Sequence, residues 1–277
     1  MLKSVIYHQT EMVYLQEGSG KIPVIFIHGF GESGSIWKYQ IEDLKKEYRL
    51  IIPDLPGSGK SVIAEEQINN MQFSQIEFYA DCLHALLDKE SIEKCFMFGH
   101  SMGGYILLAF MEKYPDKLYG SGFVHSTAFA DNDEKKKNRR KGIKIMEQYG
   151  GYAFLKNTTP NLFSAAYKTE HASEIDTLIE EGKRFDTRAL QHYYTAMMNR
   201  PDRTAVLKEC QHPFLFVIGT DDPAVPLNDA QVQATFPKTV YAHTLQSCAH
   251  KGMWEHPRLV SDFLKKYISD VLLLENG

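Results

Sequence analysis

The sequence is poor in cysteine and has no marked excess of either charge. Its 277 residues include four cysteines, 31 basic and 35 acidic residues, and its formal net charge is −4. This balance gives no support for binding to nucleic acid. No two cysteines have the Cys-x-x-Cys spacing of many zinc and redox sites, so we expect reduced, buried thiols and no metal. The four are Cys82, Cys95, Cys210 and Cys248.

Long hydrophobic runs are also missing. No stretch reaches the roughly 18 consecutive apolar residues that a membrane span needs. The first residues, MLKSVIYHQTEMV, lack the continuous apolar segment of a signal peptide. We therefore expect a cytoplasmic protein with no membrane span. The 43% of hydrophobic and 24% of charged residues are typical of a globular protein with a substantial core.

One basic cluster, KKKNRRK, occupies residues 135–141 and follows the acidic residues Asp131, Asp133 and Glu134. We interpret it as the solvated start of a helix, because acidic residues favour the first turn and a charge run usually faces water. A patch that binds an anionic ligand is the alternative.

Short apolar runs alternate with amphipathic segments through most of the chain. This alternation predicts an α/β fold with a doubly wound, mostly parallel sheet, preceded by an N-terminal hairpin over residues 4–15. We expect strands at 23–27, 50–52, 94–98, 119–124, 213–218 and 239–245, and helices at 35–48, 73–89, 103–114, 227–236 and 257–274.

The alternation stops between residues 126 and 205, where only helical patterning continues. We predict an α/β core over 1–125 and 206–277, with an all-helical cap over 126–205. The cap is expected to cover the carboxyl edge of the sheet. Its large apolar side chains could line an apolar pocket, although packing within the cap is the preferred interpretation for any one of them: Phe154, Phe163, Tyr167, Phe185, Tyr193, Tyr194, Met197 and Met198.

A serine lies between an expected strand and the helix that follows it, within the sequence GHSMG at residues 99–103. Glycine at Gly99 and Gly103 permits a sharp turn in which side chains would clash. The pattern predicts a Ser101 hydroxyl that stands above the sheet and faces a helix N-terminus, where negative charge is favoured. A glycine-rich turn with an idle serine is the alternative.

A serine nucleophile needs a base, and the base needs a carboxylate to orient it. In a doubly wound sheet these groups lie at the carboxyl ends of strands. The strand at 213–218 leads to Asp221 and Asp222, and the strand at 239–245 leads to His250. These positions give the order serine, aspartate, histidine along the chain.

With these motifs the sequence resembles the α/β-hydrolase fold superfamily over nearly its whole length. The segment RPDRTAVLK at 200–208 is similar to small esterase, enol-lactonase and haloperoxidase-like members. The motifs that carry the resemblance are HGFG at 28–31, DLPGSGKS at 54–61, GHSMGG at 99–104, GTDDPAVP at 219–226 and HKGMWEHP at 250–257.

The resemblance implies roles for particular residues. The acid of the family motif G-x-x-D-x-x-V-P aligns with Asp222, which we prefer over Asp221. The backbone N–H groups of Phe30 and Met102 would form the oxyanion hole. The remaining histidines that we considered are expected to be structural, with the first two bordering the site: His28, His100, His125, His243 and His256.

The resemblance also implies a reaction. We expect a serine hydrolase that cleaves a carboxylic ester or lactone of a small, largely apolar substrate through an acyl-enzyme, with no metal or organic cofactor. A serine at position 101 argues against dehalogenase or epoxide hydrolase chemistry, which needs an aspartate there. Two alternatives stay open: a carbon–carbon bond hydrolase of a ring-cleavage product, and a ligand receptor without turnover.

Overall fold

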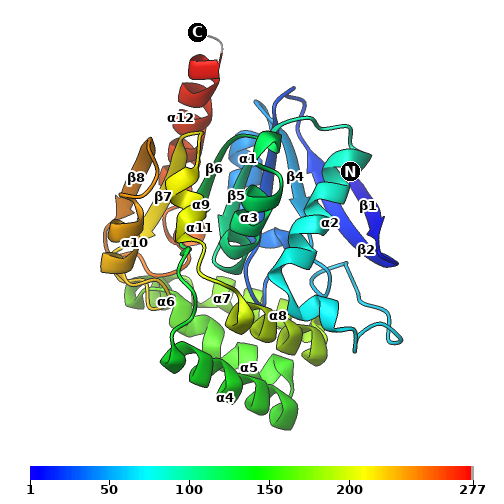
Figure 1. The fold of residues 1–277 in the computed structure, drawn as a ribbon. Coiled ribbons are helices and arrows are strands. Elements are labelled where there is room, and N and C mark those ends of the chain that lie inside the picture. The colour runs from blue at the N-terminus through cyan, green and yellow to red at the C-terminus, as the bar shows by residue number, and fades with distance from the viewer. Residues whose placement is uncertain (276–277) are drawn as a thin grey trace.

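The computed structural model of the chain describes residues 1–275, and an eight-stranded sheet forms its centre (Figure 1). The strand order is β1-β2-β4-β3-β5-β6-β7-β8. The β1–β2 and β2–β4 pairs are antiparallel and all the other pairs are parallel. The predicted doubly wound, mostly parallel α/β sheet is therefore confirmed. The strands are β1 (Leu2–Tyr7), β2 (Thr10–Glu17), β3 (Pro23–Ile27), β4 (Arg49–Pro53), β5 (Cys95–His100), β6 (Leu118–Val124), β7 (Phe214–Gly219) and β8 (Val240–Leu245).

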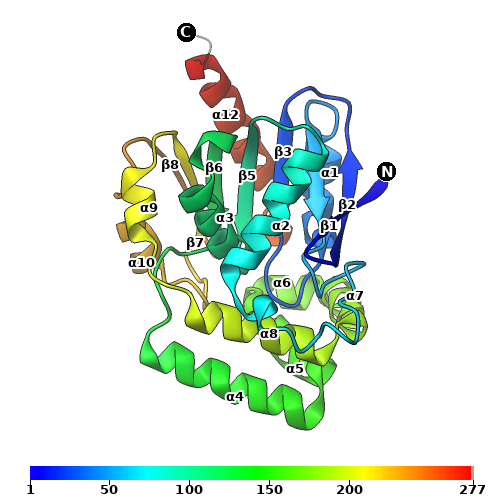
Figure 2. The same ribbon diagram turned by 45° about the vertical axis from the view of Figure 1, so that its right-hand side comes forward.

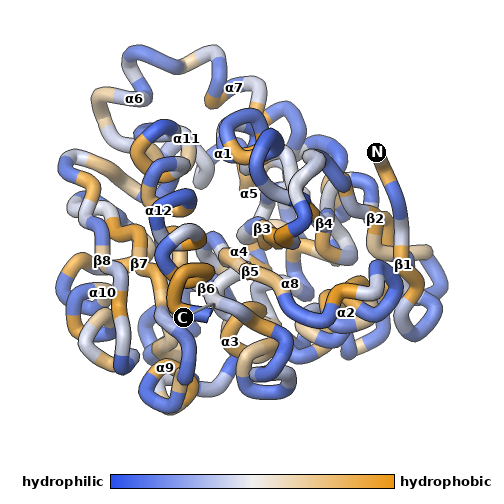
Figure 3. The backbone as a smooth tube through the Cα atoms, turned by 90° about the horizontal axis from the view of Figure 1, so that it is seen from above, coloured by the Kyte–Doolittle hydropathy of each residue, from blue (hydrophilic) through white to orange (hydrophobic). Residues whose placement is uncertain are grey.

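The central strands are apolar because both of their faces are buried. Along β3, Val24 and Phe26 pack into one hydrophobic cluster, while Ile25 and Ile27 pack into the other. This alternation follows from the period of two in a strand. Figure 3 shows the hydrophobic segments gathered along strands such as β3 and β7, inside more hydrophilic outer helices.

Helices cover both faces of the sheet (Figure 1). One face carries α2 (Ile76–Lys89), α3 (Met102–Lys113), α9 (Thr204–Glu209) and α10 (Leu227–Gln233). The other carries α1 (Lys38–Leu44), α11 (Gly252–Glu255) and α12 (Pro257–Glu275). Short 3-10 turns are η1 (Gly34–Trp37), η2 (Met71–Ser74) and η3 (Pro115–Lys117).

The segment between β6 and β7 contains no strand among the described residues and supplies the expected helical cap. Figure 2 shows α4, α5 and α8 lying across one end of the sheet. The boundaries of the cap at 126 and 205 stay a prediction, although α9, which begins at residue 204, packs on the core helix α3. The elements of this segment are α4 (Asp133–Tyr149), α5 (Gly151–Thr158), η4 (Thr159–Leu162), α6 (Ala165–Glu170), α7 (Ala172–Glu181), η5 (Gly182–Arg184) and α8 (Thr187–Asn199).

Polar contacts fix this cap to the core. The Tyr193 hydroxyl on α8 donates to the Pro56 carbonyl at 2.7 Å and lies 2.9 Å from the Ser58 hydroxyl. Where the segment leaves and rejoins the core, the Arg203 N–H donates to the Ala128 carbonyl at 2.9 Å. These contacts hold the cap against the core both at α8 and at the two ends of the segment.

Element boundaries differ from the predictions by a few residues. The helix predicted over 35–48 is a 3-10 turn followed by the short α1, because the Ser33 side chain caps the turn and the last residues before β4 leave the helix. The short α6, capped by Ser164, was not predicted. Cys82, Cys95, Cys210 and Cys248 are all free and buried. No helix in the described part of the chain is both long and apolar enough to cross a membrane.

Candidate active site

The strand-to-helix turn predicted around Ser101 is present between β5 and α3. Ser101 has φ 50° and ψ −118°, a backbone conformation that a residue with a side chain rarely adopts. A Cβ on Gly99 would lie 2.4 Å from the carbonyl carbon of Gly103, and a Cβ on Gly103 would lie 2.5 Å from the Ile27 carbonyl oxygen. The strand and the helix therefore approach each other so closely that both positions require glycine. The Ser126 hydroxyl donates to the Ser101 carbonyl at 2.7 Å and supports the turn.

Asp222 and His250, which are far apart in the sequence, meet beside this turn. His250 Nδ1 lies 2.9 Å from both carboxylate oxygens of Asp222. The N–H groups of Ala224 and Val225 donate to Asp222 Oδ1 at 2.8 and 2.9 Å, so the turn after β7 holds the carboxylate in place. The neighbouring Asp221 side chain is exposed. The structure thus brings Asp222, and not Asp221, to His250.

A second histidine also contacts Asp222. His125 Nδ1 lies 3.1 Å from Asp222 Oδ2, and the Gly252 N–H donates to His125 Nε2 at 3.2 Å. Because Nε2 accepts that bond, Nδ1 carries the proton and donates to Asp222. Burial disfavours a charge on Asp222, but the charge of His250 and the hydrogen bonds from both histidines outweigh it and hold the pKa of Asp222 below its usual range.

The group of His125, Asp222 and His250 has the composition of a metal site. Its ligand atoms all lie within 4.8 Å of one another. However, both ring nitrogens of His125 and both oxygens of Asp222 already take part in hydrogen bonds. These atoms fit a hydrogen-bonded network that orients His250, and we assign no metal to them.

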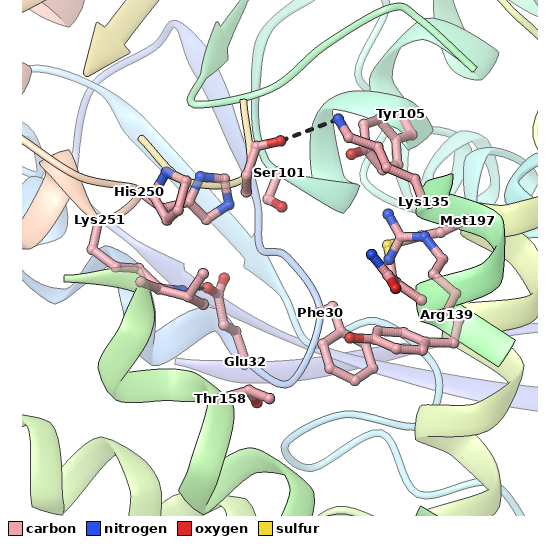
Figure 4. A pocket seen from close by; sticks show the side chains of 15 residues that line it. Phe30, Glu32, Ser101, Tyr105, Lys135, Arg139, Thr158, Met197, His250 and Lys251 are labelled. Carbon is pink, nitrogen blue, oxygen red and sulfur yellow. Dashed lines mark hydrogen bonds and ion pairs between the residues drawn. The ribbon is translucent and has the colours of Figure 1, made fainter. Parts of the chain in front are cut away.

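Ser101 and His250 line the same cavity, which has a volume of about 360 Å³ (Figure 4). Among residues 1–275 the Ser101 hydroxyl makes no hydrogen bond to His250, although both residues line this cavity. Catalytic hydrogen bonds are often long or misaligned before substrate binds. The side chains around the cavity belong to Phe30, Glu32, Ser101, Tyr105, Lys135, Asn138, Arg139, Thr158, Leu162, Tyr194, Met197, Pro223, Ala224, His250 and Lys251.

Of the two residues expected at the oxyanion hole, Phe30 lines the same cavity as Ser101, and Met102 follows Ser101 as the first residue of α3. The N–H of a first helical residue has no partner within its own helix, so it is free to bind an oxyanion. Of the cap side chains considered for an apolar pocket, Tyr194 and Met197 reach the cavity. The lining also contains several charged groups and is more polar than we expected.

Sequence reasoning missed a buried ion pair at the site. Lys251 Nζ contacts Glu32 Oε1, and both side chains are buried. Glu32 Oε2 also accepts the Gly29 N–H at 2.7 Å, and its other oxygen lies 3.2 Å from His100 Nε2. The pair therefore ties the loop after β3 to the loop that carries His250. Glu32 directly follows the HGFG motif and Lys251 lies within the HKGMWEHP motif, and these positions were the available signal.

The expected structural histidines near the site are buried and neutral. The Leu55 N–H donates to His28 Nε2 at 2.9 Å, and His100 Nδ1 donates to the Val124 carbonyl at 2.9 Å. Burial lowers the pKa of His28 to about 4 and that of His100 to about 3. Burial also lowers the pKa of His125 to about 4. The rings of His100 and His250 are 4.8 Å apart, so His100 borders the site.

These histidines predict a loss of stability in acid. Unfolded histidine titrates near about pH 6.5, so between about pH 6.5 and pH 4 the unfolded chain binds more protons than the folded chain. The free energy of unfolding should therefore fall as the pH falls through this window, by on the order of 1–3 kcal/mol per histidine. Urea denaturation at several pH values measures it. His28→Gln should reduce the slope with pH, and substitution of the exposed His8 should not; equal slopes would contradict the assignment.

The ion pair predicts a coupled effect on stability. Glu32→Gln keeps an acceptor for the Gly29 N–H but removes the carboxylate beside Lys251, whose pKa burial already lowers to about 7. The lysine must then either stay charged without a partner or give up its proton on folding, which should lower the free energy of unfolding by about 3–5 kcal/mol. In the double variant Glu32→Gln/Lys251→Met no unpaired charge remains, so most of this loss should be recovered. Chemical denaturation of the single and double variants checks both statements. Strictly additive losses would show that the two side chains do not interact.

Two curated relatives align with most of this chain. It is 27% identical over 274 residues to a 2-hydroxy-6-oxononadienedioate/2-hydroxy-6-oxononatrienedioate hydrolase of Paraburkholderia phymatum, covering 92% of this chain and 90% of that protein. It is 25% identical over 277 residues to a hydrolase of the same name from Pseudomonas putida, covering 92% of each.

Solved structures show the same fold. A thermophilic esterase from Thermogutta terrifontis, with malate bound, has a TM-score of 0.87 and 25% identity over 98% of this chain and 99% of that one. The enol-lactonase of Burkholderia xenovorans LB400 has a TM-score of 0.87 and 18% identity over 96% of this chain and 100% of that one.

A family model described as the alpha/beta hydrolase fold matches residues 22–257. This match spans strands β3 to β8, the cap segment and the loops that carry Ser101, Asp222 and His250. The chain therefore belongs to the alpha/beta hydrolase fold family.

Proposed function

We propose that the protein is a serine hydrolase that cleaves a carboxylic ester or lactone through an acyl-enzyme. The supporting observation is the arrangement at the carboxyl edge of the sheet: a strained Ser101 beside a helix N-terminus shares a cavity with His250, which lies 2.9 Å from the buried Asp222. A nucleophile, a base and an orienting acid that lie around one cavity support a mechanism of nucleophilic catalysis.

In the proposed cycle, Ser101 Oγ attacks the carbonyl carbon of the substrate while His250 Nε2 removes its proton. Asp222 accepts the hydrogen bond from His250 Nδ1, which leaves Nε2 free to act as the base. The resulting imidazolium is stabilised by the Asp222 carboxylate. It then protonates the departing alcohol, and a water activated by His250 releases the acid from Ser101.

The tetrahedral intermediate carries a negative oxygen that needs donors. In the proposal the N–H groups of Phe30 and Met102 supply them. The Gly29 N–H is bound to Glu32, which fixes the direction of the loop that continues to Phe30. The N-terminus of α3 adds a favourable dipole at the same point. The Glu32–Lys251 pair would therefore act as a positioning element for the oxyanion hole.

A second candidate is hydrolysis of a carbon–carbon bond in a ring-cleavage product. The observation that favours it is the name shared by curated relatives over about nine-tenths of this chain, 2-hydroxy-6-oxononadienedioate/2-hydroxy-6-oxononatrienedioate hydrolase. The same serine, histidine and aspartate could serve that reaction, because a carbonyl is also attacked or hydrated there. The esterase at 25% identity supports the ester proposal.

Removal of the nucleophile or of the base should abolish turnover. We expect Ser101→Ala and His250→Ala each to lower kcat by roughly 10⁴ to 10⁶ without unfolding the protein, as in other units of this kind. Steady-state hydrolysis of a short-chain 4-nitrophenyl ester, with circular dichroism as a check of folding, measures the effect. Ser173→Ala on the exposed start of α7 is the control and should behave like the wild type. A Ser101→Ala variant that keeps more than about a tenth of the rate would refute the proposal.

Competing substrates separate the two reactions. A panel of esters and lactones with varied acyl length, measured against a 2-hydroxy-6-oxo-dienoate, should give a kcat/KM at least about tenfold higher for the best ester or lactone, a difference of about 1.4 kcal/mol in transition-state stabilisation. The reverse order would assign the carbon–carbon reaction. Tight binding with negligible turnover of every member would assign a receptor.

A further inference from the structure

One wall of the catalytic cavity is built from the basic start of helix α4. The N-cap Asn132 accepts the Lys135 N–H at 2.8 Å and the helix begins at Asp133, so the basic cluster lies near the start of a helix, as predicted. Residues 135, 138 and 139 are three and four positions apart and therefore share one face of the helix. All three line the cavity that contains Ser101, and Figure 4 shows Lys135 and Arg139 across it from His250 and Lys251. This part of the basic cluster is thus not the fully solvated face that we expected.

The Lys135 ammonium has no carboxylate partner among residues 1–275. Its Nζ donates to the Ala224 carbonyl at 3.3 Å. Ala224 in turn donates its N–H to Asp222, so Lys135 is held against the loop that orients His250. A carbonyl oxygen satisfies one donor of the ammonium and leaves its charge uncompensated.

The Arg139 guanidinium is only partly neutralised. It contacts the buried Asp131 carboxylate, but Asp131 also binds the Arg200 guanidinium, with Nη1 at 2.9 Å from Oδ1. Arg200 is buried against the Tyr105 ring, whereas the Arg139 side chain is 17% exposed and lines the cavity. Two guanidinium groups therefore share one carboxylate, and Arg139 is the one that faces the cavity.

The other charges of the cavity lining cancel. Glu32 and Lys251 form their own ion pair on the far side. The net positive charge of the cavity lining therefore lies at Lys135 and Arg139. The side-chain amide of Asn138 lies between them as a further hydrogen-bond donor. A bound anion would compensate this positive charge and accept charge-assisted hydrogen bonds from it.

We propose that this face of α4, formed by Lys135, Asn138 and Arg139, is an anion-binding subsite. It takes a substrate that carries a carboxylate at the end remote from the bond that Ser101 attacks. The inference rests on the proposed function, and it defines the substrate class as the half-ester of a dicarboxylic acid or an acidic lactone. A cavity of about 360 Å³ suits a molecule of this size. Charge-assisted hydrogen bonds to lysine and arginine would then orient the scissile carbonyl toward Ser101.

A matched pair of esters tests the subsite. 4-Nitrophenyl hydrogen glutarate carries the free carboxylate, and its methyl ester has the same chain without the charge. The wild-type protein should hydrolyse the acid with a kcat/KM at least about tenfold higher, mainly through a lower KM. Lys135→Met should reduce the ratio of the two kcat/KM values by at least about tenfold, and Lys135→Arg should largely restore it.

Lys137→Met is the matched control, because Lys137 is an exposed lysine on the same helix that does not line the cavity. It should leave both kinetic constants unchanged. Equal use of the two esters by the wild type, or an unchanged ratio in Lys135→Met, would overturn the subsite while leaving Ser101-dependent hydrolysis intact. Inhibition by inorganic phosphate but not by glutarate would overturn the assignment to carboxylates.

Equilibrium binding separates the subsite from the chemistry. In Ser101→Ala, calorimetry should detect binding of 4-nitrophenyl hydrogen glutarate that is about tenfold weaker once Lys135→Met is added, a change of about 1.4 kcal/mol. If this difference is present but the wild type shows no Ser101-dependent turnover, the proposed function fails and the subsite stands. Equal affinity of the two variants for the acid would refute the subsite.

Discussion

The close approach of strand β5 to helix α3 is the constraint on which the rest of the site depends. Gly99 and Gly103 leave so little space that any Cβ there would overlap backbone atoms. This contact forces Ser101 into a positive φ, at a cost of about 1–3 kcal/mol that the surrounding packing offsets. β5 and α3 are almost wholly buried. The apolar core of the sheet thus holds a polar side chain in a conformation that it would not adopt by itself.

Around that turn, the polar groups are held by contacts between loops from different strands. Asp222 receives hydrogen bonds from two N–H groups of its own turn and from two histidines in separate loops. Glu32 links the loop after β3 to Lys251, next to His250. Each of these buried charges has a partner, so its desolvation penalty in the low-dielectric interior is offset.

The sequence predicted those parts whose signal is local. The strands, the glycines around Ser101 and the acid and histidine loops each depend on a few adjacent residues, and the structure brings Asp222 and His250 into contact. The Glu32–Lys251 pair was not predicted because it joins loops at opposite ends of the chain. The direction in which the Lys135 side chain points depends on how the cap packs against the core. A run of charged residues does not specify that packing. Helix ends, such as that of α1, are also decided by tertiary contacts.

The joint between cap and core has a consequence for how the chain folds and varies. Before α4, the Ala128 carbonyl and Asp131 contact Arg203 and Arg200, respectively, which follow α8. The cap segment therefore leaves and rejoins the core at one place. Once these contacts form, strands β6 and β7 are joined as though by a short loop, and the entropy of loop closure for the rest of the domain no longer depends on the length of the cap. We therefore expect the sheet to tolerate insertions and deletions in the outer helices, because lengthening a closed loop adds little to its entropic cost.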